Sequence, residues 1–436
     1  MRQLVVLGIL LFFITACASE KKPESKFIIT HNGQFIRNGK PYYYIGANYW
    51  YGAILGMKNG AGNRNRLIKE LDLMQSKGIN NLRILAGAEG PDGQPHRVTP
   101  TLQISPGEYN SEVSEGLDFL LSEMAKRNMV AVLYINNSWE WSGGYAQYLN
   151  WNGYGAIPYP LWQGHTWPEF MKYTAQFHQC SPCKEEFYNH VRYMLNRENM
   201  VTGVAYTNDP TIMAWEIGNE PRAFSEENKP LLLQLVKEIS ALIKSIDHNH
   251  LVTTGTEGKW GCEGDMELCK AMHQLPTVDY LTMHIWPYNW NWLDPKNVSG
   301  TIDECIKKAG EYMDEHIAVA KELGKPVVFE EFGLPRDGFS FDPSSTTSAR
   351  DKYFAYSFSK VLKNAKKNGY LAGANFWSYS GNGRPDHNNI DHLWKPGDDI
   401  IGDPPQEEQG LNSVFDSDQT MNVVAEYNSK IEKVIK

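Results

Sequence analysis

The sequence predicts a (β/α)8 barrel that forms one catalytic domain. Eight strand-like runs, each separated from the next by a segment of helical periodicity, follow one another from residue 42 onward. No strong linker divides them, and a chain of 436 residues is long enough to bury one large core. Active sites of such barrels lie at the carboxyl ends of the strands. The runs are residues 42–48, 80–85, 130–135, 212–217, 251–255, 280–285, 326–332 and 372–377.

The helical segments are clearest where apolar residues recur at three- and four-residue spacing. Residues 232–246 show this pattern, and so do residues 354–365, for which we expect the helix to end at Gly369. Gly78 and Gly324 also stand where helices give way to strands. Eight strand-then-helix units in this order favour a closed parallel barrel.

The N-terminus predicts export. Residues 4–14 are apolar but too few to span a bilayer, which suits a signal segment. Residues 14–17, "ITAC", resemble a bacterial lipobox, so we expect a signal peptide at 1–16, a lipid on Cys17, a tether at 17–26 and a catalytic domain at 27–436. An ordinary signal peptide cut near Ala18 is the alternative. The expected location is the cell envelope, at the outer membrane, with its periplasmic or surface face left open.

Composition excludes some partners. The net charge of -9 leaves no basic surface to neutralise nucleic acid or anionic lipid, so we expect neither as a partner. We also expect a monomer that meets the membrane through its lipid anchor alone. Aromatic residues make up 12% of the chain, with 13 Trp among them. Aromatic rings stack on the apolar faces of sugars, which makes a carbohydrate the favoured ligand.

Two strand ends carry carboxylates. Glu220 follows the fourth run in "IMAWEIGNEPR", and Glu330 and Glu331 end the seventh run in "KPVVFEEFG". Strands four and seven face each other across a closed barrel, so these side chains can converge. Two carboxyl groups about 5 Å apart are what a retaining glycosidase requires, whereas inversion needs a wider gap.

The stretches "WEIGNEP" and "VVFEEFG" resemble glycoside hydrolase clan A, and more narrowly family 5. The resemblance implies a (β/α)8 barrel, retention of configuration and no metal or cofactor. It implies that Glu220 is the acid/base, with a pKa raised by nearby negative charge, and that Glu331 is the nucleophile. By strand alternation Glu330 should point the opposite way, which makes it a structural candidate.

Supporting positions of the family map onto this chain one at a time. The resemblance implies that Arg83 keeps the nucleophile ionised, that Asn219 holds the sugar 2-OH, and that His284 follows strand six. Trp286 stands where the family usually has a Tyr that touches the nucleophile, so either its indole N–H or another residue does that work. Trp377 matches the platform under the sugar at the cleavage site.

The substrate class is predicted from shorter stretches of sequence. "GANYWYG", "NEPR" and "TTGTEG" resemble the β-mannanase branch of family 5, with Arg222 at a leaving-side subsite. Trp50, Trp139 and Trp141 are candidate sugar platforms or packing residues. We expect endo-hydrolysis of mannan, galactomannan or glucomannan. Exo-β-mannosidase, transglycosylase or β-1,4-glucanase activity stays open, as does, in another class, a non-catalytic surface glycan-binding lipoprotein.

Five cysteines follow Cys17. Cys180 and Cys183 form a CxxC, and Cys262 and Cys269 are seven residues apart. The second spacing is too wide for a zinc ribbon, so local disulfides are expected. Cys305 falls on the apolar side of a helical pattern and should be a buried free thiol.

Overall fold

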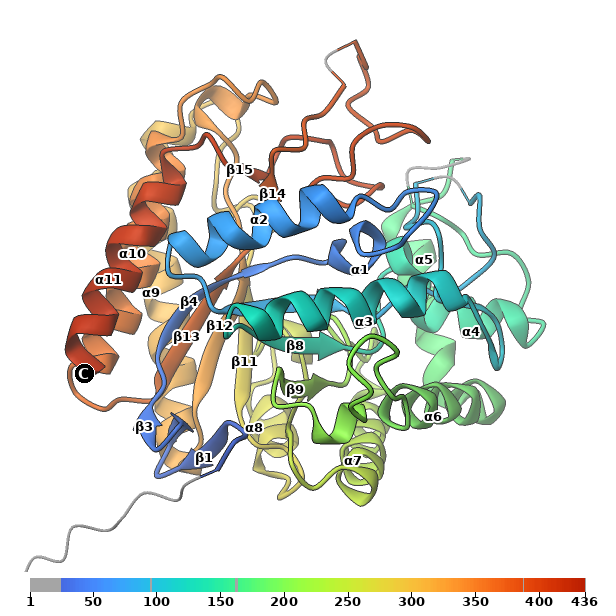
Figure 1. The fold of residues 1–436 in the computed structure, drawn as a ribbon. Coiled ribbons are helices and arrows are strands. Elements are labelled where there is room, and N and C mark those ends of the chain that lie inside the picture. Colours follow the sequence, from blue (N-terminus) through green and yellow to red (C-terminus); the bar gives the residue numbers. More distant parts are fainter. Residues whose placement is uncertain (1–24, 95, 161–163, 387, 436) are drawn as a thin grey trace, which may run out of the picture.

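Eight parallel strands form the centre of the molecule (Figure 1), a computed structural model that describes residues 25–94, 96–160, 164–386 and 388–435. Asp279 N donates to Val252 O at 2.8 Å, and Thr253 Oγ1 donates to Tyr280 O at 2.9 Å, so the first and last strands of the sheet also meet. The predicted barrel is confirmed. In sheet order the strands are β10 (Leu251–Thr253), β9 (Ile212–Glu216), β8 (Val130–Tyr134), β5 (Asn81–Leu85), β4 (Tyr44–Asn48), β13 (Leu371–Phe376), β12 (Val327–Phe332) and β11 (Leu281–Ile285).

Helices cover the outside of this barrel, and short strands pair outside it (Figure 1). The helices are α1 (Gly52–Leu55), α2 (Arg64–Ser76), α3 (Ser111–Lys126), α4 (Gly144–Trp151), α5 (Trp167–Thr174), α6 (Ser181–Leu195), α7 (Lys229–Ile246), α8 (Met266–Gln274), α9 (Val298–Leu323), α10 (Ser348–Ala365) and α11 (Thr420–Ile435). The remaining strands are β1 (Ile29–His31), β2 (Gln34–Arg37), β3 (Lys40–Pro41), β6 (Gln103–Ser105), β7 (Glu108–Tyr109), β14 (Tyr379–Gly381) and β15 (Val414–Phe415).

Burial explains why these segments take these forms. All five residues of β9 are buried, as expected for a parallel strand enclosed on both faces. Helix α7 buries one face, which carries Leu235, Ile239 and Ile243. Helix α9 ends at Gly324, whose φ of 66° is in the left-handed region that glycine adopts without strain. Helix α10 ends at Ala365, four residues before the predicted end.

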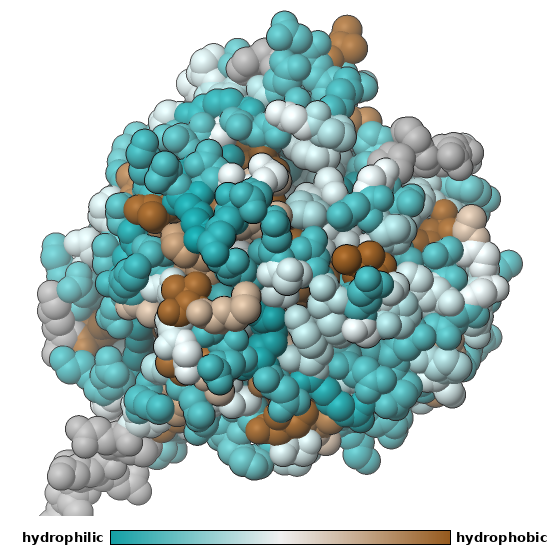
Figure 2. All heavy atoms as spheres, turned by 45° about the vertical axis from the view of Figure 1, so that its right-hand side comes forward, coloured by the Kyte–Doolittle hydropathy of each residue, from teal (hydrophilic) through white to brown (hydrophobic). Residues whose placement is uncertain are grey.

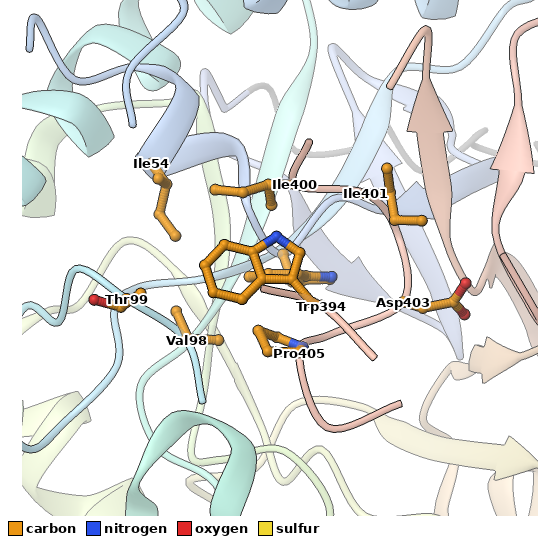
Figure 3. A pocket seen from close by; sticks show the side chains of 9 residues that line it. Ile54, Val98, Thr99, Trp394, Ile400, Ile401, Asp403 and Pro405 are labelled. Atoms are coloured by element: carbon orange, nitrogen blue, oxygen red, sulfur yellow. The ribbon is translucent and has the colours of Figure 1, made fainter. Parts of the chain in front are cut away.

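The segment 388–413 covers part of the carboxyl end of the barrel. In Figure 3 the ring of Trp394 lies between Ile54 of α1 and Pro405, in a pocket with mostly apolar walls. Trp50 Nε1 donates to Gly402 O at 2.8 Å, which ties the segment to the loop after β4. The segment is therefore packed against the barrel beside the site.

The expected leader lies outside the described residues. The signal peptide at 1–16, Cys17 and all of the tether except residues 25–26 belong to that part of the chain. Within the described ranges, none of the helices combines the length and apolar character that a membrane span requires. In the view of Figure 2, apolar residues form separate patches on a mostly hydrophilic surface.

The predictions for the cysteines are confirmed in part. Cys180 and Cys183 form a disulfide, and Cys305 is a buried free thiol, as expected. The predicted bond between Cys262 and Cys269 is wrong, because both are free thiols that hydrogen-bond to each other, with Cys269 Sγ also 3.7 Å from the His273 ring.

Candidate active site

Three polar side chains meet at the carboxyl ends of β9, β11 and β12. Glu220 follows β9, His284 lies in β11 and Glu331 in β12. One ligand atom from each lies within 4.8 Å of the others, and all three side chains are buried. The backbone of Glu220 has φ of 50°, and its N–H donates to Gly255 O at 2.9 Å. The fold thus brings together the two carboxylates that are 111 residues apart in sequence.

Glu331 accepts a hydrogen bond at each carboxyl oxygen. Arg83 Nη1 donates to Oε2 at 2.6 Å, and Trp286 Nε1 donates to Oε1 at 3.0 Å. Both donors are buried, so the two bonds form out of water. The question left by the sequence is answered: the indole N–H of Trp286 contacts Glu331 where the family usually has a phenol.

Arg83 is fully buried and organises the cluster. Its guanidinium donates to both oxygens of Glu216, at 2.6 and 3.0 Å, and to Asn48 Oδ1 at 3.0 Å. It also donates to Asn219 Oδ1 at 2.7 Å. Asn219 in turn donates from Nδ2 to Asn137 Oδ1 at 3.2 Å, so both ends of its amide are oriented.

The expectation that Glu330 points away from Glu331 is wrong. The pairing of β11 with β12 shifts between Met283 and His284, so that Phe329 and Glu331 pair with consecutive residues and Glu330 is skipped. This irregularity breaks the alternation of the strand. Glu330 Oε2 therefore lies within the same cluster, 4.0 Å from Arg83 Nε and 3.9 Å from His284 Nε2.

Glu220 accepts from a different set of partners. Trp139 Nε1 donates to its Oε2 at 2.6 Å, and Oε1 lies 2.8 Å from His284 Nδ1. Burial and the positive charge of Arg83 lower the pKa of His284 well below its ordinary value, so the imidazole is neutral. A neutral ring carries one proton, which leaves one nitrogen able to accept.

Burial raises the pKa of both central carboxyls. For Glu220 burial is the main cause of the rise in pKa, rather than the neighbouring negative charge that we expected. For Glu331 burial and then the charge of Glu220 raise the pKa well above its ordinary value. Arg83 and Trp286 oppose this shift without reversing it, so Arg83 alone does not keep Glu331 ionised. Two close carboxyls of this kind share a proton.

The remaining predicted residues lie at two sides of this centre. Arg222 Nε donates to Glu257 Oε2 at 2.6 Å, and its guanidinium lies 5.4 Å from the Trp139 ring. On the other side, aromatic rings form a chain of edge contacts that ends beside Trp286. The ring centroids are 5.9 Å apart for Trp50 and Trp141, 6.2 Å for Trp141 and Trp377, and 6.1 Å for Trp377 and Trp286.

A carboxyl from segment 388–413 is influenced by the charges of the cluster. Burial and the charges of Asp403, Glu331, Glu140 and Glu220 raise the pKa of Glu407 well above its ordinary value. Its Oε2 is enclosed and has no hydrogen-bond partner among the described residues. The same holds for Oε2 of Glu140.

Asp403 fixes the turn that carries Glu407. Its carboxylate accepts from the backbone N–H groups of Gly410, Asn412 and Ser413 at 2.8, 3.0 and 3.2 Å. It also accepts from Ser413 Oγ at 2.6 Å. Residues 403–413 therefore form a braced turn rather than a loose end.

Comparison with known proteins assigns the family. The sequence model of glycoside hydrolase family 5 β-mannosidase-like domains matches residues 25–436. The chain belongs to glycoside hydrolase family 5. A family 5 mannosidase from Rhizomucor miehei is 35% identical, has a TM-score of 0.85, and aligns over 94% of this chain and 99% of its own. A variant of that mannosidase was solved with mannosyl-fructose, at 35% identity and a TM-score of 0.86.

Other relatives are named as mannanases. Mannan endo-1,4-beta-mannosidase 1 from Oryza sativa subsp. japonica is 31% identical over 373 residues, which are 80% of this chain and 78% of that protein. An endo-1,4-β-D-mannanase from Thermotoga petrophila is 26% identical, with a TM-score of 0.65 over 89% of this chain and 99% of its own. The names of these relatives all describe enzymes that act on mannosides.

Sequence reasoning about this family 5 site missed several residues. Glu216 and Glu257 are acids inside the apolar run "IMAWEI" and the stretch "TTGTEG", and a charged residue in such a run is itself a signal of a buried partner. Asn48 ends a strand-like run, and Asn137 lies two residues after the end of another. Glu407 gives no local signal, because it lies in a polar loop far along the chain.

Glu220, His284 and Glu331 also form the group, within the described ranges, whose ligand atoms are close enough to hold a metal ion. Both carboxylate oxygens of Glu331 already accept from N–H donors on Arg83 and Trp286. A cation placed there would meet the guanidinium charge beside Glu331. The donor set fits a family 5 carboxylate pair better than a metal centre.

Proposed function

We propose that the protein hydrolyses β-1,4-mannosides with retention of configuration, with Glu331 as nucleophile and Glu220 as acid/base. The observation that carries this proposal is that one carboxylate oxygen of Glu220 and one of Glu331 lie within 4.8 Å of each other. A gap of about 5 Å fits direct attack on the sugar, whereas an inverting enzyme leaves room for a water molecule.

The hydrogen bonds support a proposal that the shared proton lies on Glu220. Both oxygens of Glu331 accept from N–H groups, which stabilise its anion. Glu220 Oε1 instead lies beside neutral His284, whose Nδ1 can accept a carboxyl proton while Nε2–H faces Glu330. We infer from these bonds a ground state with an ionised nucleophile and a protonated acid.

Two displacements follow from this arrangement. In the first, a carboxylate oxygen of Glu331 forms a bond to the anomeric carbon as the glycosidic bond breaks, and Glu220 gives its proton to the leaving oxygen. In the second, Glu220 takes a proton from water, whose oxygen bonds to the anomeric carbon while the bond to Glu331 breaks. The two inversions restore the β configuration.

Asn219 is suited to hold the 2-OH of the reacting sugar. Its amide makes one bond through each end, to Arg83 and Asn137, so one lone pair and one N–H remain. In mannose this hydroxyl is axial. A sugar that places the group elsewhere would leave a buried polar atom unpaired, at a cost of about 1–3 kcal/mol.

We further propose that the enzyme removes mannose from chain ends. Glu407 and Glu140 each present an enclosed oxygen without a partner, and the pKa of Glu407 responds to both catalytic carboxylates. Hydroxyls of a terminal sugar can satisfy such atoms, whereas an internal sugar uses one of these hydroxyls in the chain. The braced turn at Asp403 suits a fixed barrier.

Cleavage of internal bonds is the second candidate, as the sequence led us to expect. It is favoured by the mannanase names of the rice and Thermotoga petrophila relatives. Lipid anchoring through Cys17 at the outer membrane also remains a proposal, supported by "ITAC" and the apolar run before it.

Product analysis separates these functions. Incubation with mannohexaose should release mannose from the first minutes, and proton NMR should show the β anomer first. An early mixture of mannobiose and mannotriose with a fall in mannan viscosity would replace chain-end by internal cleavage. Initial release of the α anomer would refute retention, and faster hydrolysis of carboxymethylcellulose than of mannan would refute the substrate class.

A further inference from the structure

Glu330 lies beside the catalytic pair, yet the two displacements give it no task. Its side chain is 1% exposed, and its Oε2 has no hydrogen-bond partner among the described residues. Nε2 of His284 is enclosed and without a partner in the same way. These two atoms face each other at 3.9 Å. Because buried polar atoms are hydrogen-bonded in nearly all native proteins, such a pair needs an explanation.

The other contact of Glu330 is with Glu216. Both oxygens of Glu216 accept from Arg83, at 2.6 and 3.0 Å, which stabilises the anion of Glu216. Glu330 hydrogen-bonds to Glu216, while its Oε2 is 4.0 Å from Arg83 Nε. Burial and the charge of Glu216 raise the pKa of Glu330 well above its ordinary value. Glu330 is therefore the protonated member of the two, and it donates its hydrogen to Glu216.

We propose that Glu330 is a positioning residue that fixes the hydrogen of His284 on Nε2, so that Nδ1 accepts the proton of Glu220. The proposal rests on the proposed function, because that function makes Glu220 the acid. A protonated carboxyl has one hydrogen, and the bond to Glu216 uses it, so toward His284 it can only accept. Nδ1 lies 2.8 Å from Oε1 of Glu220. Hydrogen bonds around catalytic groups are often long without substrate and tighten in the complex, which fits the 3.9 Å separation of Nε2 and Glu330.

The opposite charge state of Glu330 would undo the acid. An ionised carboxylate facing the imidazole at 3.9 Å would favour a doubly protonated ring. Both nitrogens of His284 would then donate, and Nδ1–H would stabilise the anion of Glu220. The hydrogen that Glu330 shares with Glu216 thus keeps Glu220 available as an acid.

The charges around Glu330 agree with its neutral form. Arg83 is the cation next to it, and its guanidinium already pairs with Glu216 and with Glu331. A third carboxylate beside one cation would be destabilised by both neighbours. The titratable groups that face Glu330 from the surrounding elements are Glu216 on β9, Arg83 on β5, His284 on β11, Glu331 on β12, and the phenols of Tyr44 on β4 and Tyr280 before β11, whose pKa values burial raises well above the ordinary value.

Leaving-group dependence separates this role from a structural one. A mannose leaving group needs the proton of Glu220, whereas dinitrophenolate is weakly basic and departs without one. Glu330→Leu removes the acceptor for His284, so kcat/KM should fall about 10- to 100-fold on mannobiose and less than about twofold on dinitrophenyl β-mannoside. The loss of this support lowers the pKa of Glu220, so the basic limb of the mannobiose profile should move to lower pH.

Glu330→Gln is the matched control. The amide oxygen can accept from His284 and the amide N–H can donate to Glu216, which is the bonding pattern of a protonated carboxyl. Glu330→Gln should therefore recover both the ratio of the two kcat/KM values and the basic limb. The proposal would be overturned by a Glu330→Gln variant as impaired as Glu330→Leu, by an unchanged ratio in Glu330→Leu, or by equal losses on both substrates with a lowered Tm.

NMR of isotope-labelled histidine nitrogens reads the tautomer of the wild type directly, with His284→Asn to identify the signals of that ring. We expect a hydrogen on Nε2 and none on Nδ1. The reverse tautomer or a doubly protonated ring would overturn the role of Glu330, and this measurement needs no activity. Failure of the wild type to hydrolyse either mannoside would instead overturn the proposed function, so the two failures are distinct.

Discussion

Trp286→Phe should isolate the contribution of one indole N–H to the nucleophile. The substitution removes the 3.0 Å bond to Glu331 Oε1 and keeps an aromatic ring against Trp377. Trp286 is only 9% exposed, so water does not readily replace the lost donor. A hydrogen bond to a charged group contributes about 1.5–3 kcal/mol, which predicts a fall in kcat/KM of about 10- to 150-fold.

The pH dependence of activity shows in which direction the substitution shifts the pKa of Glu331. The N–H favours the ionised form of Glu331, so its loss should raise the pKa of that carboxyl further. Activity needs this group ionised and is lost as pH falls through its pKa. The acid limb of the kcat/KM profile should therefore move to higher pH in Trp286→Phe.

The assay is hydrolysis of p-nitrophenyl β-mannoside across pH, with Trp286→Tyr as the matched control. A phenol restores the donor that the family usually has at this position, so Trp286→Tyr should recover activity and the acid limb. A Trp286→Phe variant with wild-type kcat/KM and limb would refute the reasoning, and so would a Trp286→Tyr variant as impaired as Trp286→Phe.

The other predictions concern the nucleophile Glu331, the contact of Glu407 with a terminal sugar, the effect of metal removal and the lipid on Cys17. The Glu331→Ala variant should lose nearly all turnover and keep the wild-type Tm. If Glu331→Ala kept its activity and Glu330→Ala lost it, the nucleophile would be reassigned to Glu330. Glu407→Ala should raise KM for mannobiose, and an unchanged KM would exclude contact with the terminal sugar. Treatment with EDTA should leave kcat/KM unaltered, whereas loss reversed by a divalent ion would contradict a two-carboxylate mechanism. Palmitate should label the wild type and not Cys17→Ala, and equal labelling would remove the anchor.

Much of the barrel was predictable because its strands are enclosed on both faces. The runs that became β9 and β12 are nearly continuous apolar segments, and each ends with a carboxylate at the same end of the barrel. This pattern by itself predicts that Glu220 and Glu331 lie at the same end of the barrel. The resemblance to family 5 then added Arg83 and His284, and both contact the pair.

Local pattern failed where tertiary contacts override it. Alternation along a strand assigns Glu330 to the opposite face, but the irregular pairing of β11 with β12 turns it inward. The Cys262 and Cys269 thiols are hydrogen-bonded to each other but form no disulfide. The rise in the pKa of Glu331 depends on how deeply several segments bury it, which no single segment records.

The sequence by itself determined the alternation of strands and helices, the order of the barrel and the identity of the carboxylates, because hydrophobic periodicity and residue type are local properties. Tertiary structure alone decided that the Trp286 indole replaces a phenol and that the charges of the catalytic carboxylates raise the pKa of Glu407. Both depend on side chains brought together across the barrel from distant parts of the chain. Such contacts follow from the packing of the whole fold rather than from any stretch of residues.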